Sequence, residues 1–309
     1  MDKSSTPTMN VSVVISTYSV ERFNDVMECL ESLSKQTLPP SDIILSLDPD
    51  DKLVEFYSSR IPSYVKIVVI EKKGLSNARN AGIKRASGNI VAFIDDDACA
   101  DKDWLKNLIK NYEDSDVWGV GGLINPIWEN GRPRWFPDEL DWIVGCSYKG
   151  LPDHKACVRN PIGCNMSFKK TVFDKVGYFK SNVGRQGKKL LGSEEPELSL
   201  RLLDKISNAK IIYDPLAIVH HKVPKSRSNL KYFMNRSFYE GVSKRVMKSL
   251  LKSKSTKVLS VENQYLKYLL KVSIPSRLLK IHKLDSLLQV LMLILSMSLV
   301  LMGYFIPLS

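Results

Sequence analysis

The sequence lacks the marks of several common protein classes. Its five cysteines are odd in number and form no C-x-x-C pair, which argues against a disulfide framework or a zinc site and favours a reducing compartment. The start shows no apolar signal region, and we expect residues 1–9 to be disordered. No glycine occurs in Val14–Tyr18, at the end of the first apolar run, which argues against dinucleotide-binding proteins and nucleotidyltransferases with glycine-rich phosphate loops.

Acidic residues are scarce in one long C-terminal segment. The whole chain of 309 residues has a formal charge of +12. Residues 222–283 hold 16 lysines and arginines but two glutamates, a net charge of +14, whereas residues 1–221 have a net charge of −1. This concentration indicates a local anionic partner such as a membrane surface, and we expect no nucleic-acid partner.

Stretches with the apolar pattern of strands alternate with helical periodicity over the first two-thirds of the chain. The predicted strands are Val11–Ser16, Ile43–Leu47, Lys66–Ile70, Ile90–Ile94, Val117–Leu123 and Ile211–Tyr213. The predicted helices are Phe23–Ser34, Leu53–Tyr57, Leu75–Ala86, Trp104–Tyr112 and Glu194–Leu203. This order predicts an α/β fold with a mostly parallel sheet and helices on both faces. The stretch from Asn125 to Asn165 has no clear period, and such long segments are usually functional or mobile.

Three adjacent carboxylates, Asp95, Asp96 and Asp97, follow the apolar strand Ile90–Ile94. Ligands of open α/β sheets bind just beyond the carboxyl ends of the strands. Three neighbouring acids repel one another, and a bound Mg²⁺ or Mn²⁺ relieves that repulsion because these ions prefer carboxylate oxygen. The alternative is a solvated acidic turn that caps the helix starting near residues 101–103.

Five motifs, in this order and spacing over residues 10–225, resemble those of the family 2 inverting glycosyltransferases. That resemblance implies a GT-A fold, which is Rossmann-like with a mostly parallel sheet and flanking helices. It also implies transfer of a sugar from a nucleotide-sugar donor, most simply a UDP-sugar. The motifs are the opening strand Val11–Tyr18, the acidic strand end Leu45–Asp48, the G-x-x-x-A-R-N-x-G sequence Gly74–Gly82, the D-x-D sequence Phe93–Asp97, and the acidic pair in Gly192–Glu195.

The resemblance also assigns residues to the donor and to a metal ion. Asp97, supported by Asp95, is implied as the ligand of Mn²⁺ or Mg²⁺, and His220 or His221 is implied as a further ligand. Such an ion stabilises the charge of the departing nucleoside diphosphate. Arg79 adds a fixed cation near the donor, or else is a helix residue paired with a neighbouring acid. The implied donor-binding residues are Thr17, Tyr18, Asp48, Arg79, Asp95 and Asp96.

On the acceptor side the reaction needs a base that takes the proton of the attacking hydroxyl. A carboxylate suits that task. The family shows Glu-Asp where this chain has Glu194-Glu195, so Glu195 is the first candidate and Glu194 the second. The alternative is a helix start at which acids favour the helix dipole. Asn165, in a strand resembling the family's strand beside the sugar and acceptor, is implied as an acceptor-binding residue.

The sequence of the C-terminal third is typical of a segment that attaches a protein to a membrane. Residues 226–283 interleave basic and aromatic residues, which predicts amphipathic helices on a membrane surface. Leu287–Ile306 contains twenty residues without a charge, enough to cross a bilayer. We expect a transmembrane helix in residues 284–309, and the basic flank predicts a cytoplasmic catalytic domain. The alternatives are a buried hairpin, an oligomer contact or a solvated helical tail.

Residues 92–101, 128–150 and 192–198 further resemble archaeal enzymes that extend lipid-linked glycans on dolichyl phosphate, in particular the glucosyl-dolichyl-phosphate glucuronosyltransferases. This likeness implies transfer of glucuronate to a lipid-linked acceptor in protein glycosylation. A hexosyl- or rhamnosyltransferase of polysaccharide or glycolipid assembly is the alternative within the family. An inactive GT-A membrane scaffold is the alternative outside enzymes, and the intact Asp95, Asp97 and Glu195 argue against it.

Overall fold

The computed structural model describes residues 9–181, 192–250 and 259–306. Residues 1–8, part of the start expected to be disordered, lie outside this range. The strands are β1 (Val11–Thr17), β2 (Asp42–Leu47), β3 (Val65–Val69), β4 (Ile90–Ile94), β5 (Ala98–Ala100), β6 (Val117–Trp128), β7 (Ala156–Cys157), β8 (Asn165–Lys169) and β9 (Lys210–Val223). The helices are α1 (Phe23–Ser34), α2 (Asp51–Ser58), α3 (Leu75–Arg85), α4 (Trp104–Ile109), α5 (Thr171–Val176), α6 (Glu194–Lys205), α7 (Leu230–Leu250), α8 (Ser260–Tyr268), α9 (Ile274–Leu278) and α10 (Leu284–Phe305). Short helical turns are η1 (Val20–Arg22), η2 (Lys110–Glu113), η3 (Asp138–Val144), η4 (Lys225–Arg227) and η5 (Leu269–Ser273).

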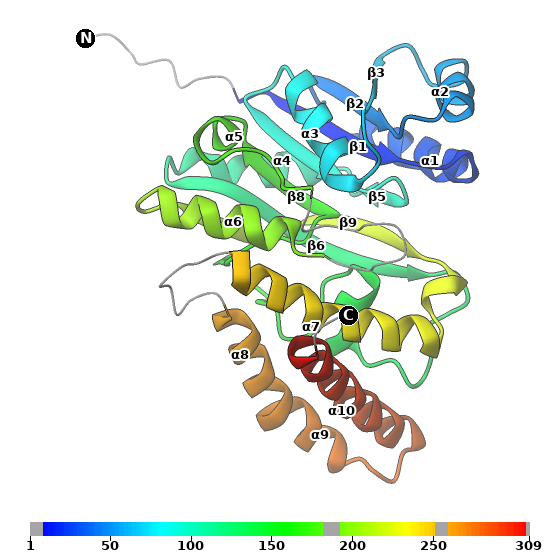
Figure 1. The fold of residues 1–309 in the computed structure, drawn as a ribbon, viewed down its shortest axis with the longest axis vertical. Coiled ribbons are helices and arrows are strands. Elements are labelled where there is room, and N and C mark those ends of the chain that lie inside the picture. Colours follow the sequence, from blue (N-terminus) through cyan, green and yellow to red (C-terminus); the bar gives the residue numbers. More distant parts are fainter. Residues whose placement is uncertain (1–8, 182–191, 251–258, 307–309) are drawn as a thin grey trace.

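One mixed sheet forms the centre of the molecule, with strand order β3-β2-β1-β4-β8-β6-β9-β5 (Figure 1). The first four strands in this order are parallel, as predicted. Beyond β4 the sheet is mixed: β8 runs antiparallel to both β4 and β6, whereas β6 and β9 are parallel. Chain direction is not encoded in the apolar pattern of a strand, so the sequence could not show this inversion.

Helices cover both faces of the sheet, as expected. One core contains apolar residues of α1, α2 and α4, and the other contains residues of α3, α5 and α6. Within β1, Val13 faces the first core and Val14 the second, since side chains alternate along a strand. Helix α3 packs close to β1 because Gly82 has no side chain; a Cβ there would lie 2.4 Å from Cγ1 of Val14.

The stretch from Asn125 to Asn165, which was expected to be a long functional or mobile segment, is largely packed. Strand β6 continues to Trp128, and η3 lies further along this stretch. The rings of Trp135 and Phe136 pack against Phe233 of α7, with ring centroids 5.5 and 5.7 Å from it. Phe233, one of the aromatic residues of the segment predicted to lie on a membrane, is fully buried. The stretch thus forms a platform for the C-terminal helices.

The C-terminal helices gather at one end of the molecule, below the sheet in Figure 1. Helices α7 and α10 touch through their backbones: a Cβ on Gly241 would lie 1.9 Å from the carbonyl oxygen of Val300, and one on Gly303 would lie 2.0 Å from that of Phe238. Helix α10 has 22 residues and is mostly apolar, so its length and composition allow it to cross a membrane.

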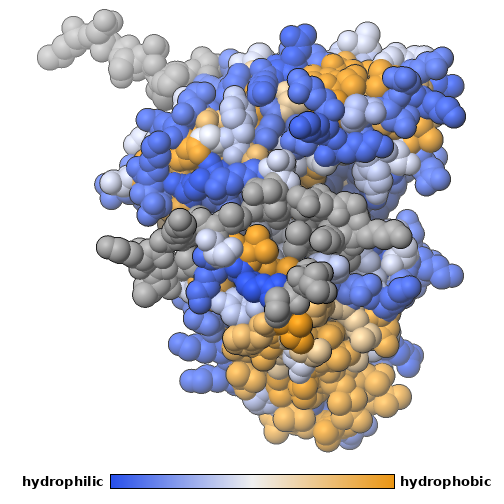
Figure 2. Space-filling model, in the orientation of Figure 1, coloured by the Kyte–Doolittle hydropathy of each residue, from blue (hydrophilic) through white to orange (hydrophobic). Residues whose placement is uncertain are grey.

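Figure 2 shows apolar side chains covering the end of the molecule that α8–α10 form. We call this surface the apolar end. Its exposed apolar residues are Leu266, Leu270, Val272, Leu278, Leu279, Ile281, Leu284, Leu287, Leu291, Ile294, Leu301, Met302, Phe305 and Ile306. Exposed apolar surfaces of such extent mark sites of membrane or protein interaction.

Candidate active site

The three aspartates lie at the reversal of strand order in the sheet. Asp95, Asp96 and Asp97 directly follow β4, which pairs with β1, while β2 and β3 continue the sheet on the other side of β1. Open α/β sheets bind their ligands at such a reversal. Thr17 ends β1 and is buried, whereas Tyr18 is 63% exposed. Tyr18 and Asp97 line the same hollow of about 260 Å³.

Two aspartates of this site are held by basic side chains. Arg22 Nη1 lies 2.7 Å from Asp96 Oδ1 and 2.7 Å from Asp97 Oδ2. His221 Nε2 lies 3.2 Å from Asp97 Oδ1, and Arg227 Nη2 lies 3.7 Å from Asp97 Oδ2. Both carboxylates are buried. The site therefore surrounds its acids with basic side chains.

Burial and these partners act in opposite directions on the two carboxyl groups. Burial raises the pKa of Asp96 well above its usual range, although Arg22 acts against this rise. Burial also acts to raise the pKa of Asp97, but the hydrogen bond with His221 and the charges of Arg227 and Arg22 outweigh it. The pKa of Asp97 is accordingly far below its usual range, and this residue is an anion.

Arg79 joins the donor-side acids to the acceptor-side acids. Its Nη1 donates a hydrogen bond of 2.8 Å to Glu195 Oε1, and its Nη2 lies 3.9 Å from Asp95 Oδ1. The guanidinium is buried, so it holds both carboxylates in a fixed relation. Gly163 makes room for this contact, since a Cβ there would lie 2.0 Å from Glu195 Oε1. The structure thus brings Asp95, Arg79 and Glu195 together.

The three glutamates at the start of α6 have different surroundings. Glu195 is partly exposed beside Arg79. Glu194 is buried, and its Oε2 accepts a hydrogen bond of 3.0 Å from the backbone of Ser193. Glu197 has a fully buried side chain and pairs with Arg201 and Lys180. The geometry therefore favours Glu195 over Glu194 as the carboxylate that meets an acceptor.

The residues around Asp97 fit a divalent ion with oxygen and nitrogen ligands. Asp95, Cys164 and His221 each offer one ligand atom, and these three atoms lie within 4.8 Å of one another. His221 is also within hydrogen-bonding distance of Asp97. Burial raises the pKa of Cys164 well above its usual range, so its thiol is protonated and poorly suited to Mn²⁺ or Mg²⁺. Asp95, Asp97 and His221 are then the residues that could hold the ion.

His220 does not join this group. It is next to His221 in β9, and adjacent side chains of a strand point to opposite faces. In the register of the sheet, His220 pairs with Cys99, and His221 pairs with Ala98. The sequence suggested either histidine as a metal ligand. Because the two side chains point to opposite faces of β9, only His221 is directed toward Asp97.

Asn165 is a correction to the predicted acceptor site. Its side chain is fully buried; Oδ1 accepts a hydrogen bond of 2.8 Å from Trp104 Nε1, and Nδ2 donates to the carbonyl oxygens of Leu123 and Ala217 at 3.0 and 2.8 Å. Both amide hydrogens are used within the protein. Asn165 therefore ties β8 to its neighbouring elements and does not face an acceptor.

Asp48 lies at the same edge of the sheet as Thr17. It follows β2, and its backbone nitrogen donates a hydrogen bond of 3.4 Å to the carbonyl oxygen of Thr17. Burial raises the pKa of its carboxyl group, while a backbone hydrogen bond from Gly74 acts against the rise. Asp48 thus lies at the strand end next to Thr17, and its role in donor binding stays a prediction.

Sequence reasoning missed Arg22 and Arg227. Arg22 lies in η1, just after the carboxyl end of β1, where the strand order alone points to ligand-facing residues. Arg227 belongs to the basic segment of residues 222–283, and its approach to Asp97 cannot be read from the charge count of that segment. Lys222 of the same segment pairs with Asp25 and Glu28 of α1 at 2.6 and 2.8 Å.

The sequence model of Glycosyl transferase family 2 matches residues 12–177. Over 290 residues the chain is 36% identical to the glucosyl-dolichyl phosphate glucuronosyltransferase of Haloferax volcanii, which covers 93% of this chain and 91% of that protein. It is 24% identical over 243 residues to the succinoglycan biosynthesis protein ExoM of Rhizobium meliloti, covering 76% of this chain and 74% of that protein.

Among solved structures, the crystal structure of GalNAc-T7 with UDP, GalNAc and Mn²⁺ resembles this chain with a TM-score of 0.53 at 16% identity. The match covers 87% of this chain and 57% of that chain. At this level of identity the likeness concerns the fold, and it agrees with the predicted GT-A architecture.

Proposed function

Because this chain belongs to Glycosyl transferase family 2, and is thus a glycosyltransferase, we propose that it transfers a sugar from a nucleotide-sugar donor to a lipid-linked acceptor of the dolichyl-phosphate type. One observation carries this proposal. The Haloferax relative covers 93% of the chain, so the similarity extends past residue 177, where the family match ends, into the C-terminal helices. Glucuronate is the sugar that we propose first, with protein glycosylation as its purpose.

The donor binds at the reversal between β1 and β4. Tyr18 is exposed there and can stack on the nucleotide, while Asp48 and Thr17 lie at the neighbouring strand ends. Arg22 and Arg227 surround the position of the diphosphate and offer fixed guanidinium groups. The departing nucleoside diphosphate is thereby received by positive charge.

Asp95, Asp97 and His221 hold Mn²⁺ or Mg²⁺ in this proposal. When bound, the ion supplies a Lewis acid that stabilises negative charge on the leaving diphosphate. Arg22 pairs with Oδ2 of Asp97, whereas His221 faces Oδ1, so Arg22 would lie beside a held ion and could also pair with an oxygen of the diphosphate.

Glu195 serves as the base on the acceptor side. The acceptor hydroxyl oxygen attacks the anomeric carbon, the bond to the diphosphate oxygen breaks, and the hydroxyl proton passes to the carboxylate. Arg79 fixes the position of Glu195 through the 2.8 Å hydrogen bond and also approaches Asp95. One guanidinium thus relates the base to the donor side of the site, which supports a direct displacement with inversion.

The apolar end attaches the enzyme to a membrane, with the catalytic domain in the cytoplasm. Helix α10 is long and apolar enough to span the bilayer, and we retain a single span as the proposed topology. The basic segment lies next to that surface, where anionic lipids attract lysine and arginine. A soluble donor and a membrane-bound acceptor then meet at one enzyme.

The test is transfer by the purified full-length chain in lipid nanodiscs. Each of a panel of UDP-sugars, including UDP-glucuronate, is supplied with glucosyl-dolichyl phosphate and Mn²⁺, and the products are identified by mass spectrometry. We expect a product larger by one glucuronate. If the product instead carries a sugar from another donor, the protein is a hexosyl- or rhamnosyltransferase and the proposal of glucuronate is wrong. Absence of transfer to every lipid-linked acceptor, with transfer to a soluble saccharide, overturns it.

A further inference from the structure

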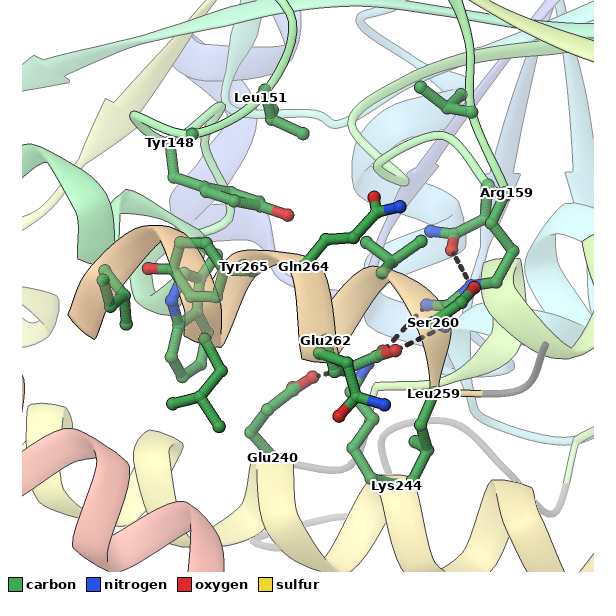
Figure 3. Close-up of a pocket in the computed structure, with 18 of the residues that line it drawn as sticks. Tyr148, Leu151, Arg159, Glu240, Lys244, Leu259, Ser260, Glu262, Gln264 and Tyr265 are labelled. Atoms are coloured by element: carbon green, nitrogen blue, oxygen red, sulfur yellow. Dashed lines mark hydrogen bonds and ion pairs between the residues drawn. The ribbon is translucent and has the colours of Figure 1, made fainter. Parts of the chain in front are cut away.

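A cavity of about 920 Å³ lies between the catalytic part of the chain and the C-terminal helices (Figure 3). Its walls come from residues 148–162 and from α7, α8 and α10. This volume is at the upper end of the range for ligand pockets, roughly 300–1,000 Å³. Among the described residues that line it, Asp95, Asp97 and Glu195 do not occur. The cavity is therefore distinct from the candidate active site.

The outer part of the cavity continues into the apolar end. Leu266 of α8 and Leu301 and Phe305 of α10 line the cavity, yet they are 41%, 56% and 72% exposed on the apolar end. A chain of hydrocarbon can therefore pass from the surface into the cavity without crossing water. Tyr148 and Tyr265, in edge contact at 4.9 Å between ring centroids, add aromatic area within the cavity.

A band of ion pairs crosses the cavity, as Figure 3 shows. Arg159 lies 2.7 and 2.9 Å from the two carboxylate oxygens of Glu262. Lys244 lies 2.8 Å from Glu262 and 2.9 Å from Glu240. The Arg159 and Lys244 side chains are only 8% and 13% exposed. Arg236 also pairs with Glu240, at 2.7 Å. Three cations thus pair with two glutamates, so the cluster keeps a net positive charge beside an apolar cleft, which suits an anionic group that carries a hydrocarbon chain.

The inner part of the cavity leads to the candidate base. Arg159, Asn160, Pro161 and Ile162 all line the cavity. The next residue, Gly163, is the one whose Cβ position lies 2.0 Å from Glu195 Oε1. One short stretch of backbone thus separates the cavity from the active site. A ligand anchored at Arg159 would place its head group beside that stretch.

We propose that this cavity binds the polyprenyl phosphate portion of the acceptor. The prenyl chain lies between α8 and α10, and the phosphate is bound by Arg159 and Lys244. The glycan linked to that phosphate extends past Pro161 and Ile162 toward Glu195. This inference rests on the proposed lipid-linked acceptor and adds where the lipid is held and which residues hold it.

The phosphate site is tested with Lys244→Met and Arg159→Met in the full-length protein in nanodiscs. Each single change leaves both glutamates with a cationic partner, because Glu240 also binds Arg236 and Glu262 binds Arg159 and Lys244. We expect the KM for the polyprenyl-linked acceptor to rise roughly ten-fold or more in each variant. Lys231→Met is the matched control on α7, because Lys231 is exposed and outside the cavity lining, and its KM should be unchanged.

The chain site is tested with Met297→Trp, which adds an aromatic group to the cavity wall formed by α10. The acceptor is supplied with either a long prenyl chain or a chain of two isoprene units. We expect the wild-type preference for the long chain, as the ratio of kcat/KM values, to fall several-fold in the variant. A photoreactive polyprenyl phosphate should also label peptides of α8 or α10.

The outcomes separate the two proposals. If no lipid-linked acceptor is used by the wild-type protein, the proposed function itself fails. If lipid acceptors are used but the KM in Lys244→Met and Arg159→Met equals that of Lys231→Met, the cavity proposal is overturned. Competition of photolabelling by phosphatidylglycerol as effectively as by unlabelled polyprenyl phosphate assigns the cavity to bulk lipid and also overturns it. Melting temperatures near that of the wild type exclude misfolding as the cause of a loss.

Discussion

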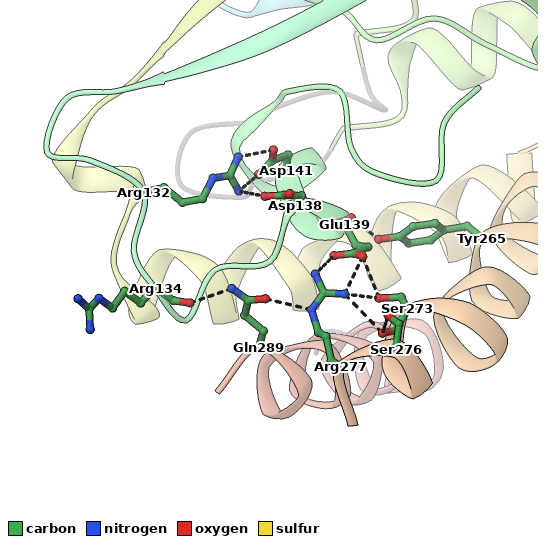
Figure 4. A network of polar contacts seen from close by, with 10 residues as sticks. All are labelled: Arg132, Arg134, Asp138, Glu139, Asp141, Tyr265, Ser273, Ser276, Arg277 and Gln289. Atoms are coloured by element: carbon green, nitrogen blue, oxygen red, sulfur yellow. Dashed lines mark hydrogen bonds and ion pairs between the residues drawn. The ribbon is translucent and has the colours of Figure 1, made fainter. Parts of the chain in front are cut away.

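Arg277 of α9 binds both carboxylate oxygens of Glu139, at 2.8 and 2.6 Å, across the boundary between the C-terminal helices and the catalytic part of the chain (Figure 4). Glu139 is fully buried, and Ser273 Oγ donates a further hydrogen bond of 2.9 Å to it. The hydroxyl of Tyr265 donates to the backbone carbonyl of Glu139. The helices are thus docked by a buried ion pair, and a chain truncated before Arg277 would leave Glu139 unpaired.

Arg277→Met should strongly destabilise the protein. Removing one partner of a buried ion pair typically costs about 3–5 kcal/mol because the other charge stays buried. The double variant Glu139→Met with Arg277→Met should recover most of that loss, since it removes the orphaned charge as well. Urea unfolding of the single and double variants measures both values. Equal stability of Arg277→Met and the wild type would show that the pair does not dock the helices.

Asp97→Asn should weaken binding of Mn²⁺ to the full-length protein by at least about ten-fold. Residues that only support a metal ligand typically contribute about 10–100-fold to affinity, and loss of a proposed ligand should cost no less. Titration calorimetry with the metal alone measures this, and EDTA should abolish sugar transfer. Asp51→Asn is the matched control, because Asp51 is an exposed acid on α2. Full transfer activity in excess EDTA would contradict the metal assignment.

Glu195→Gln should lower kcat by about 10²–10⁴, the usual loss of a positioned base, while the folded structure persists. The amide oxygen of glutamine can still accept the hydrogen bond from Arg79, so the loss reports proton transfer rather than geometry. Glu194→Gln provides the comparison. A nearly normal rate in Glu195→Gln with a dead Glu194→Gln would move the base by one residue. Activity in both would refute an acceptor-side base at α6.

Asn165→Ala should lower the free energy of unfolding without changing the KM for the acceptor. It leaves up to three buried partners of Asn165 unsatisfied, and each such group costs about 1–3 kcal/mol. Chemical denaturation together with kinetics on the folded fraction distinguishes the two effects. A raised acceptor KM at unchanged stability would restore Asn165 to the acceptor site.

The combined change Leu279→Ser with Leu284→Ser should weaken binding to vesicles by roughly ten-fold or more, because each exposed leucine of the apolar end is worth about 1.5–3 kcal/mol when buried in lipid. Leu216→Ser is the matched control, since Leu216 is 59% exposed on β9 in the catalytic part. Co-sedimentation with liposomes in high salt measures the difference. Equal sedimentation of both variants would show that the apolar end does not attach the protein to membranes.

Sequence reasoning was accurate where a local pattern determines the structure. The bounds predicted for α1 and β4 agree with the structure, because Val26, Leu30 and Leu33 keep helical spacing and Ile90–Ile94 is a continuous apolar run. The run into Asp95 predicted a site at the end of β4, because the end of a parallel strand is where ligands bind, and the structure places basic side chains around the acids there. Family resemblance then related Arg79 and Glu195, which are 116 residues apart in the chain.

Other features depend on contacts that no local pattern contains. The sequence around Asn165 is the same whether its amide binds a ligand or forms hydrogen bonds that hold neighbouring elements together. The basic segment was interpreted as a membrane-facing surface, yet Arg227, Lys244 and Arg277 pair with buried or nearly buried carboxylates. A charge count records how many cations a segment has, and only the fold shows which acids they meet.

The contact of α7 and α10 at Gly241 and Gly303 constrains how this protein can evolve. The helices supply facing walls of the cavity, with Lys244 on α7 and Tyr304 on α10. A methyl group at either glycine would force the two backbones apart, since each Cβ would lie about 2 Å from a carbonyl oxygen of the other helix. Both positions are remote from the sugar-transfer chemistry. A larger residue at either one would nonetheless alter the cavity, because it would separate two of the helices that line it.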